Sequence, residues 1–397
     1  MVWTKYLIVG GGLAADAAVE GIRQLDSDAR ILILAAEADP PYTRPWLSKG
    51  LWLGKPYERV WRGTEAKGAE LRLRRRAVRL DPARKTVTDD QGEVYEYGSL
   101  LLATGGRARR LPFGGENVIH FRTLADYRRL RLLADQGDRF TVIGGGFIGS
   151  EIAAALATNG KMVTMVFPQS AIAERVFPRD LAEHVSFYYQ EKGVVLRTGS
   201  SVLDVQKRGR GVATKIKSAS GIEEWIESDG VVAGIGIQPD IELAASAELR
   251  CDDGVVVDSL LRTSQHGIFA AGDVASFVNP ALGRRIRVEH EDNALAMGKQ
   301  AGRNMAGAEE PYTHLPYFYS DLFELGYEAV GDLDSRLEVV RDWAEPFQKG
   351  VVYYTDGSRV RGVLLWNVWD KVPAARMLIE SGESVSPKDL HGRIPPE

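Results

Sequence analysis

The pattern of hydrophobic and polar positions predicts the same short series of secondary-structure elements at two places in the chain. A short apolar run leads into three glycines and then into a stretch with helical spacing, first over residues 6–25 and again over 140–159. Each copy continues into another apolar run, at 30–34 and at 163–167. Strand, glycine turn, helix and strand in this order predict a βαβ unit that is used twice.

The stretch between the two copies has a β-type pattern. Apolar and basic residues alternate over 71–80, which predicts one strand, and residues 89–92 predict a turn. A buried strand is expected at 97–103, ending in a glycine turn, and a matching strand at 230–236 closes the second unit.

From about residue 311 the pattern changes to short strands separated by turns. We expect strands at 327–331, 336–342, 350–354 and 360–366. Asp356-Gly357 is a strong hairpin signal. A last helix is expected over 372–380 with Gly382 as its stop, and the tail after residue 381 is expected to be loosely ordered.

These patterns predict an α/β protein with two Rossmann-like dinucleotide-binding domains and a small C-terminal α+β domain. Residues 1–112 and 240–310 would form an FAD-binding domain, and 113–239 an NAD(P)-binding domain. Residues 311–397 would form the C-terminal interface domain.

Composition excludes several classes of protein. The formal net charge of −4 does not point to nucleic acid or membrane as a partner. No apolar run is long enough to span a membrane, and the chain starts directly in a strand, so we expect a cytoplasmic enzyme. The single cysteine, Cys251, cannot form an internal disulfide or a redox pair, and the six histidines show no metal-ligand spacing.

The glycine turns predict phosphate binding. In such a fingerprint the first glycine allows the tight turn, the second lets the backbone approach a pyrophosphate, and the third packs the helix against the strand. The phosphates then lie at the helix N-terminus. The positions concerned are Gly10, Gly12 and Ala15 in the first copy and Gly144, Gly146 and Gly149 in the second.

An acidic partner distinguishes the two copies. Glu37 lies 22 residues after Ala15, just past the second strand of the first copy, where a carboxylate accepts hydrogen bonds from ribose hydroxyls. The alternative is an ordinary loop carboxylate. The second copy has Gln169 in this region, with neither a carboxylate nor an arginine cluster, which favours NADH over NADPH without settling the choice.

Asp273 ends a further strand in a Gly-Asp pair before an expected helical run. It is either a simple helix cap or a second anchor for a flavin, whose ribityl chain extends beyond the pyrophosphate.

Several long segments together resemble a known family. They are PPYTRPWLSKGLW (40–52), LLLATGG (100–106), IFAAGD (268–273), RRIRVEHEDNAL (284–295), PYFYSDLFELGYEAVG (316–331) and GVLLWNVWDKVPAAR (362–376). The chain resembles the FAD/NAD(P)-dependent reductases that include ferredoxin, rubredoxin and putidaredoxin reductases, and in particular the flavoprotein core of apoptosis-inducing factor. The resemblance covers residues 8 to about 383.

The resemblance implies roles for individual residues. Arg44 would line the FAD pyrophosphate, and Lys49 would lie beside flavin N5, paired with Glu151, as the catalytic pair. A cation there favours the anionic reduced flavin. The alternatives are a solvent-facing lysine and an ordinary first-turn glutamate. The rest of the FAD site would comprise Thr104, Gly105, Arg109, Asp273, Glu289, His290 and Tyr319, and the NAD site would also include Phe147, Ile148, Glu151, Gln169 and Gly236.

Some of these assignments stay open. His290 serves equally well as a structural hydrogen-bonding residue, and Phe147 and Tyr319 either flank stacked rings or pack in the core. The family often has tryptophan at the position of Tyr319. Gln169 stands where apoptosis-inducing factor has a glutamate.

The same resemblance implies a reaction. Hydride would pass from NADH to the flavin, and electrons would leave for a ferredoxin or rubredoxin without a thiol relay, because residues 38–60 contain no cysteine. A quinone reductase or NADH oxidase, and a redox-gated interaction protein with a stable FAD–NAD complex, are the alternatives. Four arginine clusters either dock an acidic iron–sulfur partner or form a solvated surface that acids balance. They are Arg72/Arg74/Arg75/Arg76, Arg107/Arg109/Arg110, Arg128/Arg129/Arg131 and Arg284/Arg285/Arg287. A homodimer is one state that the sequence allows.

Overall fold

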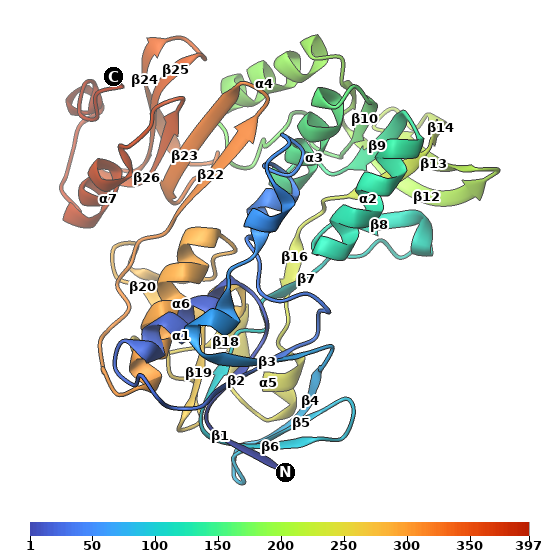
Figure 1. Cartoon of the computed structure of the whole chain (residues 1–397). Coiled ribbons are helices and arrows are strands. Elements are labelled where there is room, and N and C mark those ends of the chain that lie inside the picture. Colours follow the sequence, from blue (N-terminus) through green and yellow to red (C-terminus); the bar gives the residue numbers. More distant parts are fainter. Residues whose placement is uncertain (397) are drawn as a thin grey trace. The chain divides into compact units, whose positions relative to one another are not determined.

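The computed structural model describes residues 1–396 and shows a mixed α/β chain (Figure 1). The chain divides into two compact units, one of residues 1–44, 56–107 and 238–318, the other of 45–55, 108–237 and 319–397. The helices are α1 (Leu13–Arg23), α2 (Leu124–Gln136), α3 (Phe147–Thr158), α4 (Arg179–Glu191), α5 (Glu242–Ser246), α6 (Glu291–Met305) and α7 (Val372–Ser381). Within residues 1–396 no helix has the length and apolar character needed to cross a membrane.

Six 3-10 turns complete the helical elements. They are η1 (Arg44–Leu47), η2 (Tyr57–Val60), η3 (Thr64–Lys67), η4 (Gly115–Asn117), η5 (Gly272–Val274) and η6 (Pro387–Leu390).

A seven-stranded sheet forms the core of the first unit. Its strands are β1 (Val2–Val9), β2 (Ile31–Ala35), β3 (Ala69–Leu73), β4 (Ala77–Asp81), β5 (Thr86–Asp89), β6 (Val94–Leu102) and β19 (Ile268–Ala270). The order is β3-β2-β1-β6-β5-β4, and β19 also pairs with β6. Strand β1 runs parallel to both neighbours, with Leu7 opposite Leu32 and Leu100. The continuous apolar runs are typical of parallel strands that are buried on both faces.

Helices α1 and α6 pack against each other through small residues. A Cβ added at Gly298 or Gly302 of α6 would overlap the backbone of Ala14 or Ala18 in α1. One added at Gly21 would overlap the carbonyl of Lys299. The close approach fixes α1, whose N-terminus carries the first glycine turn.

A small sheet in the same unit corrects one prediction. Its order is β17-β18-β20-β21, built from β17 (Cys251–Asp252), β18 (Gly254–Val256), β20 (Ala275–Asn279) and β21 (Arg284–Ile286). The helical run that we expected after Asp273 is therefore wrong. Only the single turn η5 follows, and the chain then enters β20, in which every residue except Val278 is buried.

The expected strand at 71–80 is also two strands. The chain turns between β3 and β4, where Arg74 has a φ of 55° and its N–H donates to the carbonyl of Glu37.

A five-stranded parallel sheet forms the nucleotide-binding part of the second unit. Its order is β11-β10-β9-β15-β8, from β8 (Val118–His120), β9 (Arg139–Ile143), β10 (Met162–Val166), β11 (Val195–Arg197) and β15 (Gly230–Ala233). An antiparallel sheet lies between β11 and β15 in sequence, with β12 (Ser200–Arg208), β13 (Gly211–Ser218) and β14 (Glu223–Ser228). The short strands β7 (Gly106–Ala108) and β16 (Ile237–Pro239) pair with each other.

The C-terminal part is an antiparallel sheet with α7 packed against it. The order is β22-β23-β26-β25-β24, from β22 (Tyr317–Leu322), β23 (Leu325–Gly331), β24 (Glu338–Glu345), β25 (Lys349–Asp356) and β26 (Arg359–Trp366). Gly382 ends α7 in the left-handed conformation, as predicted. The expectation of a loosely ordered tail is wrong. Leu390 and Ile394 are buried, and the N–H of Ile394 donates to the hydroxyl oxygen of Tyr353 at 3.1 Å.

These features confirm the predicted fold class, two Rossmann-like units with a C-terminal α+β part. The division into three domains with the boundaries given above stays a prediction.

Candidate functional site

The first glycine turn leaves open space in front of α1. Gly10 has a φ of 122°, and a Cβ there would overlap the carbonyl oxygen of Ala103 at the end of β6. At Gly12, the N-cap of α1, a Cβ would meet no atom within 4 Å. Ala15 is fully buried in the core. The turn is tightly packed at Gly10, against β6, and open at Gly12, at the N-terminus of α1. This geometry fits a pyrophosphate bound at the helix N-terminus.

Glu37 is held by two neighbours just beyond β2. Arg44 Nη2 lies 2.9 Å from Glu37 Oε1, and the hydroxyl of Tyr42 donates to Oε2 at 2.7 Å. Arg44 Nη1 also donates to the Tyr42 hydroxyl at 2.8 Å. Glu37 and Arg44 thus form one ordered cluster, and Tyr42 is a member of it that the sequence analysis missed.

Asp273 belongs to the surroundings of the same cluster. Burial of Arg44 opposes its charge, but electrostatic interaction with Tyr42, Glu37 and Asp273, together with the hydrogen bond to Glu37, outweighs burial and raises the pKa of the guanidinium above its usual value. Arg44 therefore stays charged, in a place where a positive group can meet an anionic ligand.

Lys49 and Glu151 form a nearly buried ion pair in the second unit. The distance from Lys49 Nζ to Glu151 Oε1 is 3.2 Å, and the two side chains are 10% and 7% exposed. Lys49 Nζ also donates to the carbonyl of Tyr319 at 3.0 Å and lies 4.0 Å from the centre of the Tyr319 ring. The structure thus brings together three residues that the sequence analysis selected.

Two serines complete the surroundings of Glu151. The hydroxyl of Ser48 donates to Oε2 and that of Ser320 to Oε1, both at 2.6 Å. Each carboxylate oxygen accepts a short hydrogen bond, so the side chain has one fixed orientation. The sequence analysis did not select these serines, although both lie inside the resembling segments, next to Lys49 and Tyr319.

The remaining FAD candidates have mixed surroundings. The ring of His290 stacks on Phe318 with centroids 4.3 Å apart, and Glu289 accepts from Arg287 Nη1 at 2.7 Å. Thr104 donates through its hydroxyl to the carbonyl of Asp240 at 2.8 Å, and Gly105 has a φ of 66°. These contacts hold the strand ends in place.

Arg109 and Gly236 meet in the second unit. The backbone N–H of Arg109 donates to the carbonyl of Gly236 at 2.9 Å, and its Nε donates to that of Ile237 at 3.1 Å. The structure thus pairs one residue predicted for FAD with one predicted for NAD.

The second glycine turn repeats the geometry of the first. Gly144 has a φ of 113°, and a Cβ there would overlap the carbonyl oxygen of Gly234. At Gly146, the N-cap of α3, a Cβ would meet no atom within 4 Å, whereas at Gly149 it would overlap the carbonyl of Gly144. The turn again fits a pyrophosphate at the helix N-terminus, where Phe147 and Ile148 begin α3.

The loop after β10 carries Gln169. Its carbonyl accepts from the N–H of Gly199 at 2.9 Å. The preceding Phe167 is buried, and a Cβ added to Gly145 would lie 2.7 Å from its ring. An aromatic ring, not a carboxylate, thus follows β10 beside the glycine turn.

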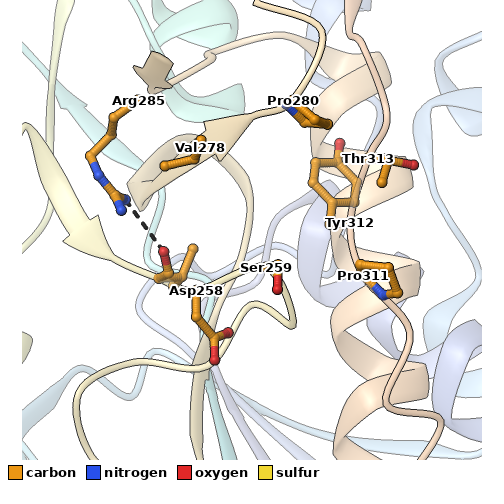
Figure 2. A pocket seen from close by; sticks show the side chains of 9 residues that line it. Asp258, Ser259, Val278, Pro280, Arg285, Pro311, Tyr312 and Thr313 are labelled. Atoms are coloured by element: carbon orange, nitrogen blue, oxygen red, sulfur yellow. Dashed lines mark hydrogen bonds between the residues drawn. The ribbon is translucent and has the colours of Figure 1, made fainter. Parts of the chain in front are cut away.

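A pocket elsewhere in the first unit lies apart from these residues (Figure 2). Its volume is about 340 Å³, and Figure 2 shows Arg285 and Val278 on one side and Tyr312 on another. None of the residues predicted for the FAD or NAD site lines it. Arg285 Nη1 donates there to the carbonyl of Val257 at 3.3 Å.

Comparison with known proteins decides the family. The family model described as pyridine nucleotide-disulphide oxidoreductase matches residues 4–298. The chain belongs to the pyridine nucleotide-disulphide oxidoreductase family. A second model, the C-terminal domain of mitochondrion-associated apoptosis-inducing factor, matches residues 301–347 and 340–381.

Three relatives of this pyridine nucleotide-disulphide oxidoreductase are similar over most of its length. Apoptosis-inducing factor 1 of Dictyostelium discoideum is 33% identical, covering 94% of this chain and 78% of that protein. The ferredoxin–NAD(+) reductase component of the anthranilate 1,2-dioxygenase system of Burkholderia cepacia is 33% identical, covering 97% and 96%. A chain of the crystallised covalent putidaredoxin reductase–putidaredoxin complex superposes with a TM-score of 0.88 at 29% identity, covering 97% and 95%.

The chain is therefore an FAD-dependent NAD(P)H oxidoreductase, and the predicted enzyme class and cofactors are confirmed. The individual roles assigned to the site residues stay predictions. Cys251 is the single cysteine and lies partly buried in β17.

Proposed function

We propose that this oxidoreductase takes electrons from NADH through FAD and delivers them to a small iron–sulfur protein of the ferredoxin or rubredoxin type. The observation that carries the proposal is the 33% identity to the Burkholderia cepacia ferredoxin–NAD(+) reductase component, which extends over 97% of this chain and 96% of that protein. The absence of a second cysteine agrees with electrons that leave without a thiol relay.

In this proposal the two glycine turns hold two different dinucleotides. The turn at Gly10 and Gly12, with Arg44, Glu37 and Asp273 beside it, would hold FAD, because the cluster offers a permanent cation and a ribose acceptor. The turn at 144–149 would hold the nicotinamide coenzyme. The division into an FAD-binding domain (1–112 and 240–310), an NAD(P)-binding domain (113–239) and a C-terminal interface domain (311–397) belongs to the same proposal.

When bound, FAD supplies the chemistry that couples two-electron oxidation of the nicotinamide to electron transfer to the acceptor. The protein supplies position and charge. Glu151, fixed by Ser48 and Ser320, holds the Lys49 ammonium in one place, and Tyr319 covers it from the ring side. A cation fixed in this way stabilises negative charge that develops nearby without reorganisation.

An anaerobic titration tests the proposal. We expect NADH to bleach the flavin absorbance with one equivalent, and the reduced enzyme to reduce ferredoxin or rubredoxin in preference to quinone and oxygen. Rapid reoxidation by oxygen or quinone, with neither iron–sulfur protein reduced, would replace the proposed acceptor by one of those classes.

A second candidate is a redox-gated interaction protein. Its support is the match of residues 301–381 to the C-terminal domain of apoptosis-inducing factor together with the Dictyostelium relative. Such a protein would form a long-wavelength FAD–NAD charge-transfer band that persists in air, and it would turn over negligibly with every carrier. Stopped-flow reduction followed by addition of acceptor separates the two candidates.

The arginine clusters offer little support for partner docking. Each contains an arginine paired with an acid of the same unit: Arg75 with Asp89, Arg107 with Glu242, Arg131 with Asp135, and Arg287 with Asp253. This pairing favours the balanced, solvated surface. A ferredoxin on-rate that falls steeply with salt would favour docking instead. The cytoplasmic location and a homodimer stay predictions.

A further inference from the structure

The loop after β10 holds a carboxylate, although not at the position directly after the strand where the first nucleotide unit has Glu37. In a βαβ dinucleotide unit, residues after the second strand meet the adenosine ribose and distinguish a 2′-hydroxyl from a 2′-phosphate. Here that strand is β10, and residues 167–169 are Phe, Pro and Gln. The first acid after β10 is Glu174, five positions beyond Gln169 in the same loop.

Glu174 turns back onto the start of the loop. Its Oε2 accepts from the backbone N–H of Ser170 at 2.6 Å, from the Ser170 hydroxyl at 2.7 Å and from the N–H of Ala171 at 3.2 Å. Consecutive backbone N–H groups together with a hydroxyl form an anion-binding concavity. In this protein the concavity already contains a carboxylate.

That carboxylate is ionised at neutral pH. The Ser170 hydroxyl, followed by the N–H groups of Ser170 and Ala171 and the charge of Arg175, lowers the pKa of Glu174. Arg179, at the start of α4, interacts electrostatically with Glu174 but forms an ion pair with Glu183 at 2.8 Å. Without Glu174 the loop would present two N–H donors and one hydroxyl beside the charge of Arg175, which is a suitable set for a phosphate.

The loop is fixed to the glycine turn of the same unit. The N–H of Ala173 donates to the carbonyl of Gly145 at 2.8 Å, and Ala173 has a φ of 54°. Glu174 therefore follows directly on a residue bonded to the middle glycine of the fingerprint. The carboxylate belongs to the nucleotide-binding end of the unit and not to a remote surface.

We propose that Glu174 determines the coenzyme preference of this oxidoreductase for NAD(H) by occupying, with its own negative charge, the donors that a 2′-phosphate would need. The inference rests on the proposed binding of the nicotinamide coenzyme at the second glycine turn. A 2′-phosphate would have to displace the carboxylate or lie beside it, and like charges at that separation repel. A 2′-hydroxyl is uncharged, so it neither has to displace the carboxylate nor is repelled by it.

Two substitutions test the inference. Glu174→Gln removes the charge and keeps an amide oxygen that accepts from the loop N–H groups, so the loop keeps its shape. Glu174→Ala empties the concavity. Glu191→Gln, an exposed acid at the end of α4, is the matched control.

Binding is measured on the oxidised holoenzyme by calorimetry with NAD+, NADP+ and 2′,5′-ADP, and the kcat/KM values for NADH and NADPH are compared. We expect Glu174→Ala and Glu174→Gln to tighten NADP+ and 2′,5′-ADP about tenfold, with NAD+ affinity changed by less than about threefold. The control should match the wild type.

The other possible results distinguish a failure of this inference from a failure of the proposed function. If both coenzymes bind and the NADP+/NAD+ ratio of the Glu174 variants equals that of the wild type, this inference is wrong and the proposed function stands. A wild-type enzyme that prefers NADP+ also contradicts it. If neither coenzyme binds and neither reduces the flavin, the proposed function is wrong and this inference is wrong with it.

Discussion

The surroundings of Glu151 show how a carboxylate can be held inside a protein. Burying a charge is costly unless it is paired and hydrogen-bonded. Here one cation and two hydroxyls share the two carboxylate oxygens, from Lys49, Ser48 and Ser320. Removal of one partner leaves the other charge buried, whereas removal of both charges does not.

Substitution at this pair therefore has a non-additive effect on stability. We expect Lys49→Met to lower the free energy of unfolding by about 3 kcal/mol, since breaking a buried pair leaves Glu151 without its cation. Lys49→Met combined with Glu151→Gln should regain most of that loss. Urea unfolding of the two single variants and the double variant gives the coupling energy, and strict additivity would contradict the buried pair.

At the scale of elements, the first nucleotide unit depends on how closely two helices approach. The carbonyl groups of α1 lie where side chains of α6 would otherwise project, so Gly298 and Gly302 leave room for them. Since α1 begins at the first glycine turn, its position and that of the turn are coupled.

Gly302→Ala tests this coupling. The added methyl would overlap the backbone of Ala18, and such overpacking costs about 1–3 kcal/mol. We expect lower thermal stability and a lower FAD content of the purified protein. The exposed Lys299→Ala on the same helix is the control, and unchanged FAD content in both variants would show that α1 tolerates displacement.

Strand β8 contributes a pH dependence to stability. The Nε2 of His120 accepts from the N–H of Leu111 at 3.0 Å, so the folded state needs the neutral ring. Burial, followed by the charge of Arg110, lowers the pKa of His120 below its usual 6.5. As the pH falls below about 6.5, His120 becomes protonated in the unfolded chain while it is still neutral in the folded protein. The free energy of unfolding therefore decreases as the pH falls.

We expect His120→Gln to reduce this acid loss, because an amide oxygen can still accept from Leu111 and does not titrate there. Urea unfolding at about pH 7 and about pH 5.5 measures the slope. Burial also lowers the pKa of His184, so part of the wild-type slope should persist. Equal slopes in variant and wild type would exclude His120 as a source.

Short sequence patterns predicted those elements whose conformation is set by neighbouring residues in the chain, such as the two glycine turns. Gly10 and Gly144 were recognisable because only a positive φ and a missing side chain allow their turns. The break at Arg74 does have a local signal, because Arg74, Arg75 and Arg76 interrupt the alternation of apolar and basic residues, and the bond to Glu37 then fixes the turn. The buried tail was missed because Leu390 and Ile394 are isolated among polar residues.

The Glu151 network was only half predictable for a related reason. Lys49 and Glu151 came from resemblance to a family, whereas Ser48 and Ser320 were not selected. Their hydroxyls meet the carboxylate from segments that are far apart in sequence, and no spacing rule connects such segments.

At the scale of the whole molecule, the absence of a second thiol restricts how electrons leave. Burial raises the pKa of Cys251, so its thiol is protonated at neutral pH and a poor nucleophile. Cys251→Ser should therefore retain acceptor reduction by NADH within about twofold. Steady-state assays with and without a thiol-alkylating reagent check this, and strong inhibition that the variant abolishes would implicate the thiol.

The pairing of β19 with β6 also affects how the protein is made. Ala270 lies opposite Leu102, and α6 covers α1 only after still more of the chain exists. At translation rates of about 5–20 residues per second, the early strands wait on the order of ten seconds or more on the ribosome with an incomplete sheet. During that interval apolar strands are exposed, so newly made protein should depend on chaperones far more than the finished enzyme does.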